Sequence, residues 1–287
     1  ASCRRNGRVT PKNMNKSVPG SLALRHSGDG RVILLPMPAL VDLSIDGPIA
    51  TITLNRPQKR NALSPELIVD FHATLDALGD ADGIRVVVIT GSGSAFCAGM
   101  DLRGVLDDPA AMAEMLGGLS KGLHRLRMVP CPTIAKVNGA AVGGGCGLAI
   151  VPDFTIAAES ATMGYPEVDL GVCPAVVAPW LIMRIGAGPA RAMLLEGGTM
   201  TAADAHARGL VTTVVPPESL DREVLDLANS LVTGEATAMA VTKQWLNELD
   251  GSMEEDVFEC AATVSAEVIA GEEAQTRLSR LYGSSGT

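Results

Sequence analysis

The stretch that decides the fold is residues 132–149, which read PTIAKVNGAAVGGGCGLA. Its first half contains Thr133–Val137, an apolar run of strand length that predicts a buried strand. Its second half, from Gly143 to Ala149, is rich in small residues and predicts a glycine loop that runs into a buried helix. A strand that passes through a glycine loop into a helix is typical of α/β folds.

The segments on either side continue this alternation of strand and helix. Two alternating runs around Asp46-Gly47 predict a hairpin over 41–54, and Ser64-Pro65 predicts a helix start. The run 85–90 predicts a strand buried on both faces, and the glycine-rich segment 91–99 follows it. Two more strands are expected, at 154–157 and 211–215. Further helices are expected at 110–128, 188–196, 201–208, 218–232, 235–249 and 253–281.

These elements predict an α/β core with a helical region after it. We expect a basic N-terminal extension over 1–38, a core over 39–215 and a C-terminal helical region over 216–287. The extension holds seven basic residues and one acid, which leaves 16 basic against 31 acidic residues in the remainder. We interpret the extension as flexible, or as lying upstream of a natural start at Met14 or Met37. An organelle transit peptide is the third interpretation.

Composition excludes several classes of function. Of the 287 residues, 47% are apolar, enough for a large core, but only 3% are aromatic, which leaves no platform for stacking bases. Because the net charge is −9, polyanions are disfavoured and we expect no nucleic-acid partner. We expect no membrane partner either, since no segment approaches the ~20 apolar residues of a membrane span.

The six cysteines are scattered, with no CxxC pair and no histidine at metal-ligand spacing. We therefore expect no metal site and reduced thiols, which suit the cytoplasm. A mitochondrial location is the alternative if the basic extension is a transit peptide.

The two glycine-rich loops do not match phosphate-binding motifs. Segment 91–96 breaks the GxGxxG pattern at Phe96, and Gly143–Gly147 lacks the Lys-Ser/Thr that ends a P-loop. Each loop instead follows a buried strand and opens toward a helix, so their backbone N–H groups can converge as an oxyanion hole. Glu167 is a candidate proton carrier beside it. Spacing alone leaves a solvated loop acid as the alternative.

Four ordered motifs carry a resemblance to a family: residues 55–63 (NRPQKRNAL), 91–102 (GSGSAFCAGMDL), 132–149 and 165–171 (YPEVDLG). Over about residues 40–281 the chain resembles the crotonase superfamily of enoyl-CoA hydratases and isomerases, and it is nearest in motif to the methylglutaconyl-CoA hydratase-like branch. The resemblance implies a crotonase-like α/β spiral of ββα units with a C-terminal helical trimerisation region. It implies an acyl-CoA substrate, self-association as a homotrimer or dimer of trimers, and no cofactor besides the CoA of the substrate.

By motif position, the resemblance implies an oxyanion hole formed by the N–H groups of Met100 and Gly144, with Glu167 as the acid–base catalyst. It also implies that residues of the first two motifs contact CoA, namely Lys59, Arg60, Ala62, Ala98, Asp101 and Leu102. The Lys-Arg pair with which the family often ends is missing, and Arg277 or Arg280 is the candidate substitute.

The sequence departs from typical hydratases at the first of their two glutamates, where Gly147 stands. Two acid–base groups are thereby reduced to one. The leading hypothesis is an enoyl-CoA hydratase that acts on a 2-enoyl thioester, its acyl group branched or carboxylated, through Glu167 alone. Asp169 is a candidate helper. The alternatives are a Δ3-Δ2 enoyl-CoA isomerase and a non-catalytic acyl-CoA-binding protein.

Overall fold

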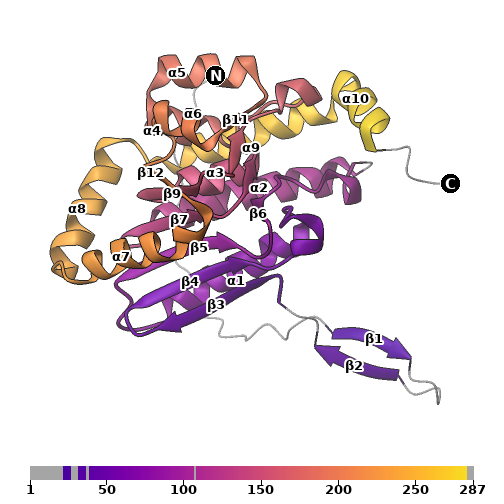
Figure 1. Ribbon diagram of the computed structural model, residues 1–287. Coiled ribbons are helices and arrows are strands. Elements are labelled where there is room, and N and C mark those ends of the chain that lie inside the picture. The colour runs from indigo at the N-terminus through magenta and orange to yellow at the C-terminus, as the bar shows by residue number, and fades with distance from the viewer. Residues whose placement is uncertain (1–21, 27–31, 37–38, 107, 283–287) are drawn as a thin grey trace, which may run out of the picture. The chain divides into compact units, whose positions relative to one another are not determined.

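The computed structural model describes residues 22–26, 32–36, 39–106 and 108–282, which Figure 1 traces as a ribbon. The chain divides into two units, Ala1–Ala39 and Leu40–Thr287. In the first unit, β1 (Leu22–His26) and β2 (Val32–Pro36) pair as an antiparallel hairpin. The rest of the expected extension lies outside the described residues. Its interpretation, and the boundary expected at 215–216, stay predictions.

Six strands of the second unit form one sheet, in the order β12-β9-β7-β5-β4-β3. The predicted hairpin is present as β3 (Val41–Asp46) and β4 (Ile49–Leu54), which pair antiparallel. All other neighbours in this sheet run parallel. The remaining strands are β5 (Val86–Gly91), β7 (Thr133–Val137), β9 (Phe154–Ala158) and β12 (Thr213–Val215).

Both faces of the middle of this sheet are covered, which is why β5 is buried along its whole length. The hairpin strands β3 and β4 instead alternate between more and less buried positions, and β3 is mostly exposed. On one face, Val88 belongs to a buried cluster with Leu220 of α7 (Leu220–Val232). On the other face, Ile89 belongs to the main core. The helices that contribute to that core include α1 (Pro65–Gly79), α2 (Pro109–Arg127) and α3 (Gly144–Ile150).

A second sheet has four strands in the order β11-β10-β8-β6. They are β6 (Ala95–Cys97), β8 (Ala140–Val142), β10 (Thr162–Gly164) and β11 (Thr199–Thr201). The sequence did not predict them, because three residues are too few to show a period of two. Glycine permits the close pairing: a side chain at Gly139 would overlap the carbonyl oxygen of Ser94.

The chain alternates between the two sheets in a repeating order. Each repeat places one strand in the six-stranded sheet, the next strand in the four-stranded sheet, and then a helix. The repeats are β5-β6-α2, β7-β8-α3 and β9-β10-α4, the last ending in α4 (Ala178–Ile185). The α/β architecture built from ββα units is therefore confirmed.

The C-terminal part is helical, as predicted. The expected helix over 253–281 is divided at Gly271, which has an extended conformation between α9 (Glu255–Ala270) and α10 (Glu272–Tyr282). α9 packs along α2 (Figure 1). α8 (Ala236–Leu249) also belongs to this part, and α5 (Ala187–Glu196) and α6 (Ala202–Ala207) precede it in the chain. Among the described residues, no helix combines the length and hydropathy needed to cross a bilayer.

Candidate active site

Three parallel strands of the four-stranded sheet end at one edge, and each leads to one candidate residue. Met100 follows β6, Gly144 follows β8, and Glu167 follows β10. All three residues line the same pocket. The carboxyl ends of parallel strands are a common place for ligand sites in α/β proteins, because the loops that follow them converge there. The topology thus brings together three residues that lie far apart in the sequence.

The N–H group of Met100 is left free by the pairing of its neighbours. Leu63 N donates to Gly99 O (2.8 Å) and Asp101 N donates to Leu63 O (2.8 Å), which forms a parallel bridge. In such a bridge the middle residue, Met100, turns its own N–H away from Leu63. Within the described part of the chain, that N–H has no protein acceptor.

The N–H group of Gly144 is free for a different reason. Gly144 is the first residue of α3, and the N–H groups of a first helical turn have no intrahelical acceptor. A side chain at Gly144 would meet Leu119 Cδ2 at 2.8 Å, so glycine is what allows the backbone to approach α2. Two unpaired amides at one pocket have the composition of an oxyanion hole, which stabilises negative charge on a carbonyl oxygen.

Glu167 is held by its backbone, while one oxygen of its carboxylate remains without a hydrogen-bond partner in the part of the chain that the structure describes. Its carbonyl oxygen accepts hydrogen bonds from Leu170 N (3.0 Å) and Val172 N (2.8 Å), at the start of the 3-10 turn η3 (Val168–Leu170). Its Oε2 is buried and, among the described residues, has no hydrogen-bond partner. Burial raises the pKa of Glu167 to about 7, opposed by a backbone hydrogen bond that lowers the pKa. A carboxyl group with that pKa can both accept and donate a proton near neutral pH.

The position where typical hydratases carry their other glutamate is closed by packing. A β-carbon at Gly147 would lie 2.7 Å from Val177 Cγ1 and 3.5 Å from Leu123 Cδ1. Val177 also lines the pocket, while Gly147 lies behind it in α3. Among the described residues that line the pocket, Glu167 is the only carboxylic acid.

The residues nominated for CoA binding gather where the first two motifs meet. Ala98 N donates to Arg60 O (3.0 Å), and Ala62 N donates to Lys59 O (3.1 Å). Both basic side chains are exposed. Leu102 and Ala98 also line the pocket.

Asp101 makes a structural contact in addition to its place in the motif. Its Oδ2 accepts a hydrogen bond from Arg56 Nη1 at 2.7 Å, and that nitrogen also donates to Ala62 O. The buried Asn61 donates to the carbonyl oxygens of Ser92 and Ala95, both at 2.9 Å. This network, which sequence reasoning missed, fixes the first motif against the second.

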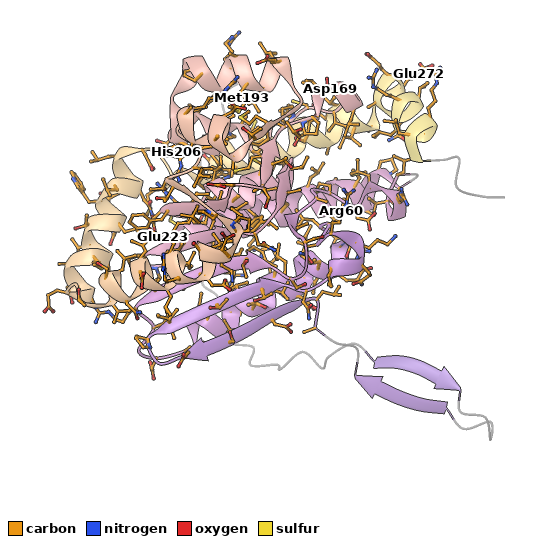
Figure 2. All side chains as sticks on the ribbon, viewed as in Figure 1. Arg60, Asp169, Met193, His206, Glu223 and Glu272 are labelled. Carbon is orange, nitrogen blue, oxygen red and sulfur yellow. The ribbon has the colours of Figure 1, made fainter. Side chains whose placement is uncertain are left out.

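Two further candidates lie outside the pocket lining. Asp169 is exposed, and its Oδ2 accepts a hydrogen bond from Gly198 N at 2.9 Å. Figure 2 shows Asp169 well separated from Arg60. Arg277 of α10 reaches the 165–171 motif, because a β-carbon at Gly171 would be 3.4 Å from Arg277 Cδ.

The sequence also contains one GxSxG run, Gly118–Gly122. It lies inside α2 rather than at a strand-to-helix turn, so it lacks the setting of a hydrolase nucleophile. Ser120 is buried, and its Oγ donates to Phe258 O at 2.8 Å, which binds α9 to α2.

Comparisons with known proteins agree on one family. The family model described as enoyl-CoA hydratase/isomerase matches residues 44–281. A putative enoyl-CoA hydratase of Thermus thermophilus is 38% identical over 224 residues, which cover 77% of this chain and 88% of that protein. A 1,2-epoxyphenylacetyl-CoA isomerase of Escherichia coli is 35% identical, over 70% of this chain and 79% of that one. A crystal structure of an enoyl-CoA hydratase/isomerase from Xanthobacter autotrophicus has a TM-score of 0.77 at 29% identity, covering 86% of this chain and 95% of its own.

Proposed function

This chain belongs to the enoyl-CoA hydratase/isomerase family, and from that premise we propose that it is an enoyl-CoA hydratase with Glu167 as its single acid–base group. The observation that carries the proposal is the meeting of Met100 N–H, Gly144 N–H and the Glu167 carboxyl group at one pocket. Two amides supply the stabilisation of an oxyanion, and one carboxyl group supplies the proton transfer.

In the proposed reaction the two N–H groups hold the thioester oxygen, and Glu167 acts first as a base and then as an acid. The thioester oxygen of a 2-enoyl-CoA accepts hydrogen bonds from the Met100 and Gly144 N–H groups. The Glu167 carboxylate takes a proton from water as the water oxygen bonds to the β-carbon, and the electrons of the double bond pass into an enolate. The protonated Glu167 then gives its proton to the α-carbon, which restores the thioester carbonyl. The net change is the addition of one water, and the carboxylate is regenerated.

The test is the substitution Glu167→Gln, which keeps the size of the side chain and removes its proton-transfer ability. We expect hydration of crotonyl-CoA to fall at least ~100-fold, the usual loss when a general acid–base group is removed. Asp169→Asn is the matched control, because it makes the same chemical change two residues away on an exposed side chain. Unchanged turnover in Glu167→Gln, or an equal loss in Asp169→Asn, contradicts the assignment.

A Δ3-Δ2 enoyl-CoA isomerase is the second candidate, supported by the packing of Val177 against Gly147. With one carboxyl group in the pocket, a proton can be moved between carbons without water being activated. Mass spectrometry of the products separates the two functions. Hydration adds the mass of one water to crotonyl-CoA, whereas isomerisation converts 3-hexenoyl-CoA to its 2-enoyl isomer without a mass change. Return of both compounds unaltered would favour the non-catalytic acyl-CoA-binding alternative.

We also propose that the chain assembles as a homotrimer or a dimer of trimers. The support is an exposed apolar stripe on α8, formed by Val241, Trp245 and Leu249 with 60%, 58% and 65% of their surfaces exposed. These residues are four apart, so they share one helix face. Light scattering coupled to gel filtration should give three or six times the chain mass of 29.6 kDa. A monomer or dimer contradicts this assembly.

A further inference from the structure

The described side chains that line the pocket carry no positive charge that could pair with the buried Glu167 carboxyl group. Apart from Glu167, the polar side chains that line it are Cys173 and Ser265. Among the described lining residues there is no lysine, arginine or histidine. The apolar side chains of the wall include Leu116, Leu119, Val172, Val176, Val177 and Ile269.

One side of this wall comes from the C-terminal region, through α9. Ser265 and Ile269 are four residues apart and therefore lie on the same face of the helix. Both are buried, with 1% and 2% of their surfaces exposed, and both line the pocket. Residues that are adjacent in sequence but exposed, such as Val264, lie on another face of α9.

Hydrogen bonds fix this part of α9 in place. Ser265 Oγ donates to Cys173 O at 2.9 Å, which joins the helix to the loop that follows Glu167. Nearer the start of α9, Phe258 O accepts from Ser120 Oγ of α2 at 2.8 Å. A wall anchored to both neighbours does not move easily, so the position of Ile269 sets a limit on the space that is available.

We propose that α9 makes the pocket selective for short, uncharged acyl groups, with Ile269 as the residue that limits acyl length and Ser265 as a positioning residue that holds α9 against the Cys173 loop. This inference rests on the proposed function, because it assumes that an acyl thioester occupies the pocket. Of the acyl groups that the sequence left open, it disfavours the carboxylated one. A carboxylate there would lose its hydration without gaining a cation, and it would lie near the Glu167 carboxyl group.

The first part of the test compares ligands on the unmodified protein, by isothermal titration with saturated acyl-CoAs. Valeryl-CoA and glutaryl-CoA have the same number of acyl carbons and differ in the terminal carboxylate. We expect valeryl-CoA to bind at least about tenfold more tightly, because an apolar pocket penalises the charged group. Equal affinity, or tighter binding of glutaryl-CoA, would overturn the selectivity for uncharged groups.

The second part tests Ile269 with butyryl-CoA and octanoyl-CoA. Ile269→Ala should raise the affinity for octanoyl-CoA relative to butyryl-CoA by about tenfold, the value of one to two newly buried methylene groups. Val264→Ala is the control, since it removes an aliphatic side chain from the exposed face of the same helix. Ile269→Val removes a single methyl group and should shift the ratio in the same direction by a smaller factor, which covers the case in which Ile269→Ala fails to fold.

Ser265→Ala should also change the ratio of the affinities for octanoyl-CoA and butyryl-CoA, because α9 loses its hydrogen bond to Cys173 O. A purely structural role would lower thermal stability and leave this ratio unchanged. If the ratio stays constant in all the Ile269 and Ser265 variants while acyl-CoAs still bind, the inference alone is wrong. If the unmodified protein binds none of the four acyl-CoAs, both the proposed function and this inference are wrong.

Discussion

The carboxylate of Glu167 occupies the space into which a side chain at Gly143 would project. A β-carbon at Gly143 would be 2.9 Å from Glu167 Oε1 and 3.4 Å from Glu167 Cδ. Gly143 has a φ of +56° and immediately precedes Gly144, whose N–H is half of the proposed oxyanion hole. One glycine therefore serves two groups: its lack of a side chain leaves room for the acid, and its backbone conformation directs the chain into α3.

Gly143→Ala should abolish at least ~99% of activity, because the new methyl group displaces the Glu167 carboxylate and the loop carries Gly144. Part of any stability loss will come from placing alanine at the φ of +56° and ψ of −124° of Gly143, which costs about 1–3 kcal/mol. Gly47→Ala is a matched control, since Gly47 has a φ of +54° and a β-carbon there would meet nothing within 4 Å. Kinetics and thermal unfolding of both variants separate the two effects. Equal activity losses would show that backbone strain, rather than contact with Glu167, is responsible.

The rate of hydration should depend on pH through Glu167. Because water activation needs the carboxylate, and because burial raises the pKa of Glu167 to about 7, kcat/KM should rise from pH 5 through an inflection near 7 and level off above it. The measurement is kcat/KM for crotonyl-CoA between pH 5 and 9, with Asp169→Asn expected to keep the same inflection. A rate that falls as pH rises through 7 would mean that the protonated form is required.

Because of the same raised pKa, Glu167 should lower the free energy of unfolding as the pH rises from about 4.5 to about 8. The folded state holds the proton more tightly than the unfolded state, whose carboxyl pKa is 4.5. The stabilisation is therefore fully present below about 4.5 and is lost as pH rises through about 7. Relative to Glu167→Gln, the unmodified protein should lose up to about 3 kcal/mol of unfolding free energy between pH 4.5 and 8. Urea denaturation of both proteins at several pH values measures this loss. The same dependence of unfolding free energy on pH in both proteins would contradict the prediction.

Gly147 and Val177 should show strong energetic coupling. Alanine is favoured over glycine by about 1 kcal/mol inside a helix, yet Gly147→Ala should destabilise the protein by about 1–3 kcal/mol because its β-carbon would overlap Val177 Cγ1. Val177→Ala removes that atom. The double variant should therefore be more stable than the sum of the two single effects by at least about 1 kcal/mol, measured by urea denaturation in a double-mutant cycle. If the effects of the two substitutions on stability simply add, the side chains around Gly147 can rearrange to accept the new methyl group, and the predicted coupling is wrong.

The sequence predicted the elements that carry a clear period or a capping signal. The hairpin at 41–54, the strand Thr133–Val137 and the helix begun at Ser64-Pro65 agree with the structure, because local patterns of apolar and turn residues specify them. It missed β6, β8, β10 and β11. Their three-residue strands form only because distant glycine segments pair with one another, and that pairing leaves no local pattern.

The sequence by itself determined the family and nominated Met100, Gly144 and Glu167, because the motifs that contain them are contiguous and ordered along the chain. Only the tertiary structure decided the surroundings of those groups. It buries Glu167 Oε2 without a hydrogen-bond partner among the described residues, fills the space at Gly147 with Val177, and completes the pocket with Ile269 from α9. The physical reason is that burial, pKa and steric closure depend on neighbours that are far apart in the sequence, and such contacts exist only after the chain has folded.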